Sequence, residues 1–506
     1  MSFYKFFLYL RAGHLENLIS CPISITNMKY RLLLVLIFIF LVVTIVGINI
    51  FIKPGELFVN LSTNSISDSR AREITLRVTD QSNVSIKDAE IFYEQISQNF
   101  MYNVGEYSDN GAKEAGSNTE GIYLDWFWGE IEPEDDVYNW SYLEVTGILD
   151  KDGNLRSDTE HAEHVFLRLG IIATSAWIVG EKMDTFRETG YPIWIDKNNL
   201  TQVKIKYLDF VEALLHHLKF KPDFYMIEVE VNVLGINAGM TNSEILDWLN
   251  LFVNKIKEVD VTARVSIVVS SSDLSPFMEE QRTKNELLVE QDRCPLSVTD
   301  FLKKMNNTNY DIITVFIQPF GWFSKGNWSD ASKFLDSLCA FNKFVYIAWV
   351  SFLVEEPQVP EILNPQPNGI NTTGFVYYPN PEGHSEKWQK EQTMNLMKYI
   401  ISNPKIIGVH WDIIDYIETG TGGKDVEVRL ATGFTPGYRD TKTNEVFEGE
   451  KRQVYEPMKE LWQDFFSKGS IKTDGNGIAK FIGFSGKYRL VVSHPDYGSK
   501  TMIINI

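Results

Sequence analysis

The segment FYMIEVEVNVLG, from Phe224 to Gly235, alternates apolar and acidic side chains. Successive side chains of an extended strand point to opposite faces, so Glu228 and Glu230 are predicted to share one face and Ile227 and Val229 the other. Carboxylates on such an apolar strand are costly to bury unless they are paired, protonated or lining a wet pocket. The segment therefore predicts a strand that presents acids to a site, with a solvated polar face as the simpler alternative.

Similar short apolar segments recur along the chain after Phe100, separated by amphipathic stretches. One such stretch, from about Val203 to Leu218, has apolar residues at helical spacing, and another starts at Thr241 with a capping box to Glu244. Eight segments are typical of strands: FMYNVG, YLDWFWG, VFLRLGII, FYMIEVEV, ARVSIVVS, YDIITVFIQPF, FVYIAWVSF and IIGVHWDII. Eight β/α units predict an α/β fold of the (β/α)8 type, and the absence of a Walker loop argues against an open nucleotide-binding sheet.

The flanks of this region have a different pattern. ITLRV and AEIFYEQ precede it, and GSIKTDGNGIAKFIGFSGKYRLVV follows it, with short alternating runs between turn residues. Each flank is too small to bury much apolar surface alone. We therefore expect one joint β-sandwich beside the barrel, built from segments before and after it.

The N-terminal part contains a long apolar run. RLLLVLIFIFLVVTIVGINIFI, from Arg31 to Ile52, is long enough for a membrane-spanning helix, and the basic residues before it place residues 1–30 in the cytoplasm. Met28 is an alternative start to Met1. The predicted order is a cytoplasmic segment (1–30), a transmembrane anchor (31–53), an N-terminal β unit (54–99), the barrel (100–467) and a C-terminal β unit (468–506).

The composition of the chain limits the kinds of molecule that it can bind. The 506 residues carry a formal net charge of -19, which argues against nucleic acid and favours a neutral polymer. Seven Asn-x-Ser/Thr motifs follow the apolar run and agree with an extracellular glycoprotein held in the cell membrane. Cys294 and Cys339 either pair or remain as buried thiols. His161 and His164 lack a third ligand at metal spacing, so neither a metal nor another cofactor is expected.

Several segments resemble a known enzyme family. GIYLDWFWGEIEPEDDVYNWSY, from Gly121 to Tyr142, resembles the second strand and loop of retaining clan-A glycoside hydrolases. ITLRVTDQSNVSIKDAEIFYEQISQNFMYNVG, YDIITVFIQPFGWF and ELWQDFFSKGSIKTDGNGIAKFIGFSGKYRLVV resemble glycoside hydrolase family 10, the endo-β-1,4-xylanase family, and the similarity spans about residues 70 to 506. It implies a (β/α)8 barrel that hydrolyses β-linked, xylan-like polysaccharide, with an acid/base Glu after the fourth strand and a nucleophilic Glu after the seventh.

Only one of the two catalytic glutamates implied by the resemblance has a counterpart in this chain. Glu230 takes the acid/base position, but Val229 stands where the family has Asn, and the nucleophile position falls on Trp349. An indole cannot form the glycosyl intermediate. Either another carboxylate (Glu228, Asp412 or Asp415) completes a catalytic pair, or the barrel binds glycan as a pseudo-hydrolase without cutting it.

Aromatic and polar residues at predicted strand ends supply candidate sugar contacts. Tryptophan faces stack on sugar rings, although large aromatic residues more often fill a core. The candidate substrate-binding residues are Trp128, Trp177, Gln318, Trp322, Trp349, His410 and Trp411.

Overall fold

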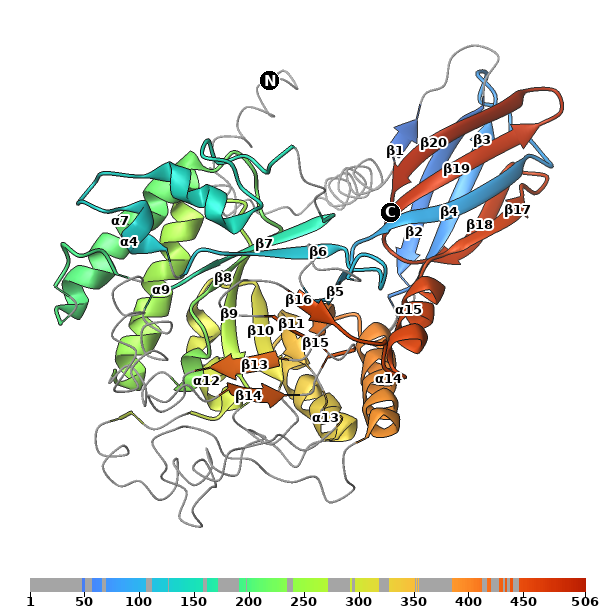
Figure 1. Ribbon diagram of the computed structural model, residues 1–506. Helices are drawn as coiled ribbons and strands as arrows, with labels where there is room; N and C mark the ends of the chain where they lie inside the picture. The colour runs from blue at the N-terminus through green and yellow to red at the C-terminus, as the bar shows by residue number, and fades with distance from the viewer. Residues whose placement is uncertain are drawn as a thin grey trace, which may run out of the picture.

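The computed structural model contains a barrel and a β-sandwich side by side (Figure 1). It describes residues 48–50, 57–65, 70–105, 112–125, 127–157, 162–171, 191–196, 198–233, 240–271, 292–293, 296–317, 327–350, 352, 354, 385–411, 416–419, 427–430, 433–434, 437–439 and 446–506.

Eight parallel strands form a nearly closed barrel in the order β5-β12-β11-β10-β9-β8-β7-β6. Seven of the strands match segments predicted from the sequence to within one residue, and the predicted barrel is confirmed. The prediction was wrong for the second strand, because β6 shares only Tyr123 with the predicted segment YLDWFWG, whose later residue Trp128 begins helix α4. The strands are β5 (Met101–Val104), β6 (Thr119–Tyr123), β7 (His164–Leu169), β8 (Phe224–Ile227), β9 (Val265–Ser270), β10 (Ile312–Ile317), β11 (Phe344–Val350) and β12 (Ile406–Trp411).

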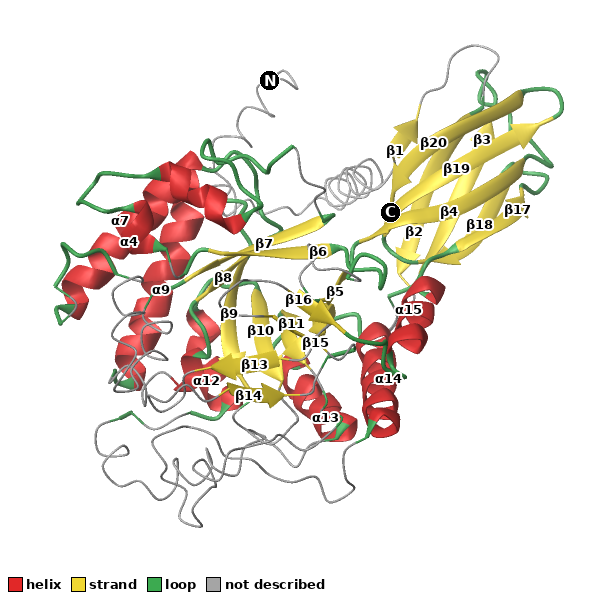
Figure 2. Ribbon diagram, in the orientation of Figure 1, coloured by secondary structure: helices red, strands yellow, loops and turns green. Residues whose placement is uncertain are grey.

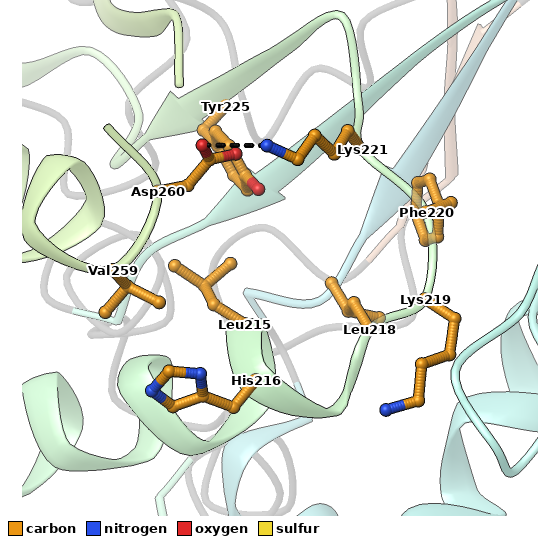
Figure 3. Close-up of a pocket in the computed structure, with 9 residues that line it drawn as sticks. All are labelled: Leu215, His216, Leu218, Lys219, Phe220, Lys221, Tyr225, Val259 and Asp260. Carbon is orange, nitrogen blue, oxygen red and sulfur yellow. Dashed lines mark hydrogen bonds and ion pairs between the residues drawn. The ribbon is translucent and has the colours of Figure 1, made fainter. Parts of the chain in front are cut away.

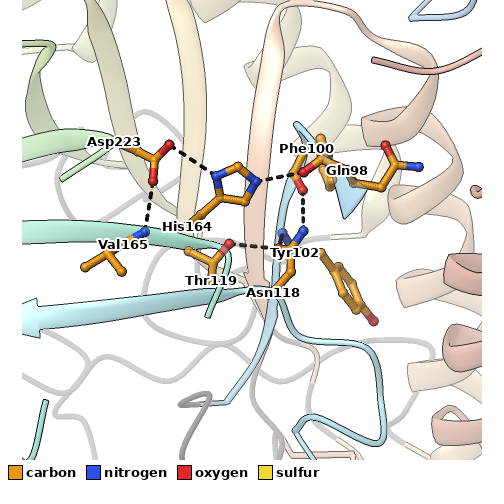
Figure 4. Close-up of polar contacts among 8 residues, drawn as sticks. All are labelled: Gln98, Phe100, Tyr102, Asn118, Thr119, His164, Val165 and Asp223. Atoms are coloured by element: carbon orange, nitrogen blue, oxygen red, sulfur yellow. Dashed lines mark hydrogen bonds and ion pairs between the residues drawn. The ribbon is translucent and has the colours of Figure 1, made fainter. Parts of the chain in front are cut away.

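Hydrogen bonds to Asn118 bring β5 and β6 together at the seam of the barrel (Figure 4). Its backbone N donates to the Tyr102 carbonyl at 2.8 Å, and the Tyr102 N donates to Asn118 Oδ1 at 2.7 Å. Nearby, His164 at the start of β7 contacts Asp223 through Nδ1 at 3.1 Å and the Gln98 carbonyl through Nε2 at 2.7 Å. The amino-terminal edge of the barrel is therefore closed by well-partnered polar groups.

Helices surround the barrel (Figure 2). The predicted stripe of α7 is buried, and Thr241 forms the predicted capping box, accepting from Glu244 N at 3.2 Å while Glu244 Oε2 accepts from Thr241 N at 2.8 Å. The helices are α4 (Trp128–Ile131), η1 (Trp140–Thr146), α7 (Leu200–His217), η2 (Val231–Val233), α9 (Asn242–Val259), α12 (Val298–Lys304), η4 (Met305–Asn307), α13 (Trp328–Cys339), α14 (Glu386–Ser402) and α15 (Tyr455–Asp464).

The barrel has two apolar cores, one inside the ring of strands and one outside it. The inner core includes Phe166, Phe224, Met226 and Tyr346, and the outer core lies between the strands and the helices. Alternate residues of each strand therefore face the two cores, as the pleat requires.

Two four-stranded antiparallel sheets form the sandwich, and both mix strands from the two ends of the chain. One has the order β1-β2-β3-β18 and the other β17-β4-β19-β20, with a shared apolar core between them. The predicted joint sandwich is confirmed. Its strands are β1 (Ile48–Ile50), β2 (Phe58–Ser65), β3 (Arg72–Thr79), β4 (Glu90–Gln98), β17 (Lys468–Lys472), β18 (Ile478–Gly483), β19 (Gly486–His494) and β20 (Gly498–Asn505).

Two hairpins lie outside the barrel and the sandwich. They pair β13 (Tyr416–Thr419) with β14 (Glu427–Leu430), and β15 (Gly437–Arg439) with β16 (Val446–Glu448). The sequence analysis did not predict them.

Arg70, between β2 and β3, joins the sandwich to the barrel. Its guanidinium donates to the carbonyls of Ile400, Ile401, Asn403 and Ile406 at and after the end of α14. Burial lowers the pKa of Arg70 to about 9. A cation placed on these carbonyls caps the helix and fixes the linker against it.

The predicted membrane helix requires one correction. Ile48–Ile50 form strand β1, which pairs antiparallel with β2, so the apolar run does not continue as a helix to Ile52. The strand register explains this, because Ile48 and Ile50 pair with Leu61 and Val59 of the sandwich. Residues 31–47 lie outside the described residues, and in the described part of the chain no helix is long and apolar enough to cross a membrane.

Candidate active site

The turn after β8 differs from the predicted alternating strand. Strand β8 ends at Ile227, and Glu228 and Glu230 both adopt left-handed backbone conformations, with φ of 55° and 50°. Such conformations are uncommon for residues other than glycine and cost about 1–3 kcal/mol each. The prediction that both acids share one strand face is therefore wrong, because the turn ends the period-two alternation.

Glu228 is directed toward the helices outside the barrel. Its Oε1 accepts from Trp248 Nε1 on α9 at 2.8 Å and from the Ile171 backbone N at 3.3 Å. The residue is fully buried. A carboxylate that accepts these two hydrogen bonds is not placed to act as the second carboxylate of a catalytic pair, which would be the nucleophile or the base.

Glu230 follows two residues later at the carboxyl-terminal edge of the barrel, where sites of this fold lie. The residue is only 5% exposed, and no hydrogen bond to it is seen in the described part of the chain. Burial raises the pKa of Glu230 from 4.5 to about 8. The carboxyl group is therefore mainly protonated at neutral pH, as a general acid must be.

Inward-facing aromatic residues line the same edge of the barrel. Trp349 of β11 is half-buried and meets the Phe316 ring of β10 edge-on, with centroids 6.4 Å apart. Phe316 in turn packs against the inner core. Trp349 thus provides a partly exposed aromatic surface at the mouth of the barrel.

His410 and Asn103 are register partners on β12 and β5. Burial lowers the pKa of His410 to about 4, so its imidazole is neutral at physiological pH. Asn103 is fully buried, yet among the described residues neither its Nδ2 nor its Oδ1 has a hydrogen-bond partner, and the same holds for Ser270 Oγ at the end of β9. Buried polar atoms without partners are rare in native proteins and point to water or a ligand.

A charged pair at this edge was missed by the sequence analysis. Arg168 Nη2 of β7 lies 2.9 Å from Asp125 Oδ2, and the Arg168 guanidinium lies 4.4 Å from the centroid of the Tyr123 ring. Both charges lie in or just after strand segments that were otherwise apolar, LDW and FLRL, which was the available signal.

The other predicted site residues divide into two groups. Trp128 and Trp411 are fully buried in the outer core, where Trp128 Nε1 donates to Glu132 at 2.7 Å, so they are core residues and not sugar contacts. The second group lies outside the described residues: Trp177, Gln318, Trp322, Asp412 and Asp415, and also Cys294. Cys339 is a half-buried free thiol.

Two further features contain none of the predicted site residues. A shallow pocket at the amino-terminal end of β8 is lined by Leu215, His216, Leu218, Lys219, Phe220, Lys221, Tyr225, Val259 and Asp260, with Lys221 paired to Asp260 at 3.0 Å (Figure 3). Oxygens of Glu132, Asp135 and Asp136 lie within 4.8 Å of one another, but Trp128 and Lys206 already bind this cluster.

No protein-family model and no curated protein sequence matches this chain. Among solved structures, it is similar to a GH53 catalytic domain from Ignisphaera aggregans, with 12% identity, coverage of 71% of this chain and 95% of that one, and a TM-score of 0.40. Native xylanase 10B from Thermotoga maritima gives 12% identity, 72% and 95% coverage and a TM-score of 0.40. A GH5_18 structure from Streptomyces cattleya in complex with GlcNAc gives 10% identity, 72% and 80% coverage and a TM-score of 0.44. Likeness at this level assigns neither a family nor a substrate to this chain.

Proposed function

We propose that this chain is a glycoside hydrolase whose barrel acts on a β-linked, xylan-like polysaccharide, with Glu230 as the general acid. The observation that carries the proposal is the buried Glu230 carboxyl at the end of the fourth barrel strand, whose pKa of about 8 keeps it protonated at neutral pH. The resemblance of the sequence to family 10 supports the same position for the acid.

In the proposed reaction, Glu230 donates its proton to the glycosidic oxygen as the bond to the anomeric carbon breaks. A second carboxylate must either attack that carbon or activate a water molecule. Glu228 is held by Trp248 and Ile171. Asp412 and Asp415, directly after β12, are therefore our candidates for the second role.

The alternative is a glycan-binding barrel without hydrolysis. Its specific support is Trp349, a half-buried aromatic residue in the sequence position where family 10 has its nucleophile. An indole face stacks on the apolar C–H face of a sugar ring, and several such contacts together would give weak but specific binding.

We also propose a location for this activity. The apolar run from residue 31 and the basic residues before it support a single membrane anchor with the barrel outside the cell. Protease added to intact cells is then expected to degrade the barrel, and full protection would contradict this arrangement.

The test of function uses the whole chain in detergent, because β1 belongs to the sandwich and a truncation after it would remove that strand. Reducing-sugar release is measured on a panel of β-linked polysaccharides for the wild type and for Glu230→Gln. We expect the substitution to reduce the rate roughly 100-fold or more. Equal rates would remove Glu230 from the mechanism.

Binding measurements distinguish a hydrolase from a barrel that binds glycan without cutting it. If no polysaccharide is cut but one is bound, and Trp349→Ala weakens that binding about 10-fold, the hypothesis of a glycan-binding pseudo-hydrolase is supported. If glycan is neither bound nor cut, both readings fail.

A further inference from the structure

Two left-handed residues in one short turn need a cause outside the turn. Glu228 and Glu230 are separated only by Val229, and both have positive φ. Strained backbone of this kind persists only where surrounding contacts impose it, and it is concentrated at functional sites. The contacts that impose it are found on Glu228.

Three contacts anchor Glu228 at the back of the barrel. Its backbone N donates to the Leu169 carbonyl at 2.8 Å, which extends the pairing of β8 with β7 by one residue. Its Oε1 accepts from Trp248 Nε1 and from the Ile171 N. Main chain and side chain are therefore both fixed, and the direction in which the chain leaves β8 is fixed with them.

The neighbouring residues fit closely around this carboxylate. A Cβ atom added to Gly170 would lie 2.9 Å from Glu228 Cα and 3.0 Å from Oε2, so only glycine leaves room there. The Gly170 N donates to Tyr207 Oη of α7 at 2.8 Å, and Tyr207 contacts the Trp248 ring. The ends of β7 and β8 are thus connected to α7 and α9 through one buried group.

A buried carboxylate is an expensive way to fill this space. An apolar residue of similar volume would pack against Trp248 without desolvating a carboxyl group, and replacing buried charged groups by apolar residues often leaves stability unchanged or improved. An apolar residue would not fix the orientation of the chain at this position, because its side chain accepts no hydrogen bond. The chemistry of Glu228 therefore points to a role in orienting the chain.

We propose that Glu228 is a positioning residue, which holds the turn after β8 so that the Glu230 carboxyl is presented at the mouth of the barrel. The inference rests on the proposed function of Glu230 as the acid. Glu228 acts through Trp248 and the Ile171 backbone and does not itself touch the substrate.

Substitutions on both sides of the Trp248 hydrogen bond test this role. Glu228→Ala removes the acceptor, Trp248→Phe removes the donor, and Glu228→Gln keeps an acceptor oxygen in nearly the same volume. We expect the first two to lower kcat roughly 10- to 100-fold with KM little changed, because misplacement of a catalytic group by about 1 Å has effects of this size. Glu228→Gln is expected to restore most of the rate and the wild-type pH profile.

Glu132 provides a matched control. It is also a buried glutamate that accepts from a tryptophan, Trp128, and from a backbone N, that of Asp136, but it does not belong to the β8 turn. Glu132→Ala should lower thermal stability as Glu228→Ala does, while leaving the alkaline limb of the pH profile in place. If Glu228→Ala changes only stability, with kcat, KM and pH profile equal to wild type, the proposal is overturned.

A non-additivity test and a direct titration complete the design. Glu228→Ala added to Glu230→Gln should cause little further loss, since the first residue acts through the second. The pKa of Glu230, followed by NMR of the carboxyl carbon, should change in Glu228→Ala and not in Glu132→Ala. This titration needs no turnover, so a wild type without hydrolase activity would defeat the proposed function while the titration still decides the positioning role. An unchanged Glu230 pKa would refute it.

Discussion

The two edges of the barrel differ in how two of their buried polar groups are partnered, although the carboxyl-terminal edge also holds the Arg168–Asp125 pair. At the amino-terminal edge, Asn118 and His164 bind protein partners through every polar side-chain group (Figure 4). At the carboxyl-terminal edge, Asn103 has no partner and Glu230 shows none in the part of the chain that is described. Paired groups stabilise a fold, whereas unpaired ones cost free energy that only a ligand or a reaction recovers. The contrast indicates that one edge serves stability and the other serves function.

Replacing Glu230 at the carboxyl-terminal edge should give the largest change in stability, and the change should depend on pH. The pKa of Glu230 is raised in the folded state, from 4.5 to about 8. Between these values the unfolded chain has already lost this proton, so stability falls as pH rises from about 4.5 to about 8. Glu230→Gln has no such proton, and we expect it to be more stable than wild type at pH 8 by about 2–4 kcal/mol, with little difference at pH 4.5.

Thermal unfolding of both proteins at several pH values measures this difference. Parallel curves across the range would mean that Glu230 is not buried as a neutral acid, and the contrast between the two edges would lose its main support.

Two asparagines allow the contrast to be tested with one chemical change. Asn118 accepts from Tyr102 N and Thr119 Oγ1 and donates to the Phe100 carbonyl, so Asn118→Leu should cost about 2–3 kcal/mol. Asn103→Leu removes polar atoms that have no partner and should be neutral or slightly stabilising. Chemical denaturation compares the two, and similar losses would show that Asn103 has a structural partner after all.

Replacing His164 should give the smallest loss of stability of the substitutions proposed here, and this loss should depend on pH. Burial alone would lower its pKa, but the hydrogen bonds and charge of Asp223 and the Gln98 carbonyl outweigh burial and raise it above 6.5. The resulting stabilisation is complete below pH 6.5 and is lost as pH rises through the folded-state value. His164→Gln should therefore cost about 1–2 kcal/mol near pH 6 and less at pH 9.

The exposed His216 is the control for this experiment. His216→Gln should leave stability unchanged at both pH values. A loss in His164→Gln that is the same at pH 6 and pH 9 would argue against a charged imidazolium.

The sequence predicted what depends on local pattern. Seven of the eight barrel strands, the buried stripe of α7 and the Thr241 capping box follow from side-chain period and capping chemistry. The joint sandwich follows from the small size of each flank. These features need no knowledge of distant contacts.

The details of the site depend on distant contacts and were not predictable in the same way. The left-handed turn at Glu228 is imposed by Trp248, twenty residues later, and by the space left at Gly170. The pairing of Arg168 with Asp125 joins the ends of two strands. Periodicity placed Glu228 and Arg168 in predicted strand segments but carried no information about their partners.

The interleaved sandwich has a consequence for how the chain is made. Lys480 of β18 contacts Glu73 of β3 across 407 positions of sequence, and β17 and β19 both flank β4. During synthesis, β2, β3 and β4 leave the ribosome long before their neighbours exist, with strand edges and one apolar face open. The barrel in between has all its strands available earlier. Assembly should therefore finish at the two chain ends, and an early strand that meets the tail of another copy would form a strand-exchanged dimer.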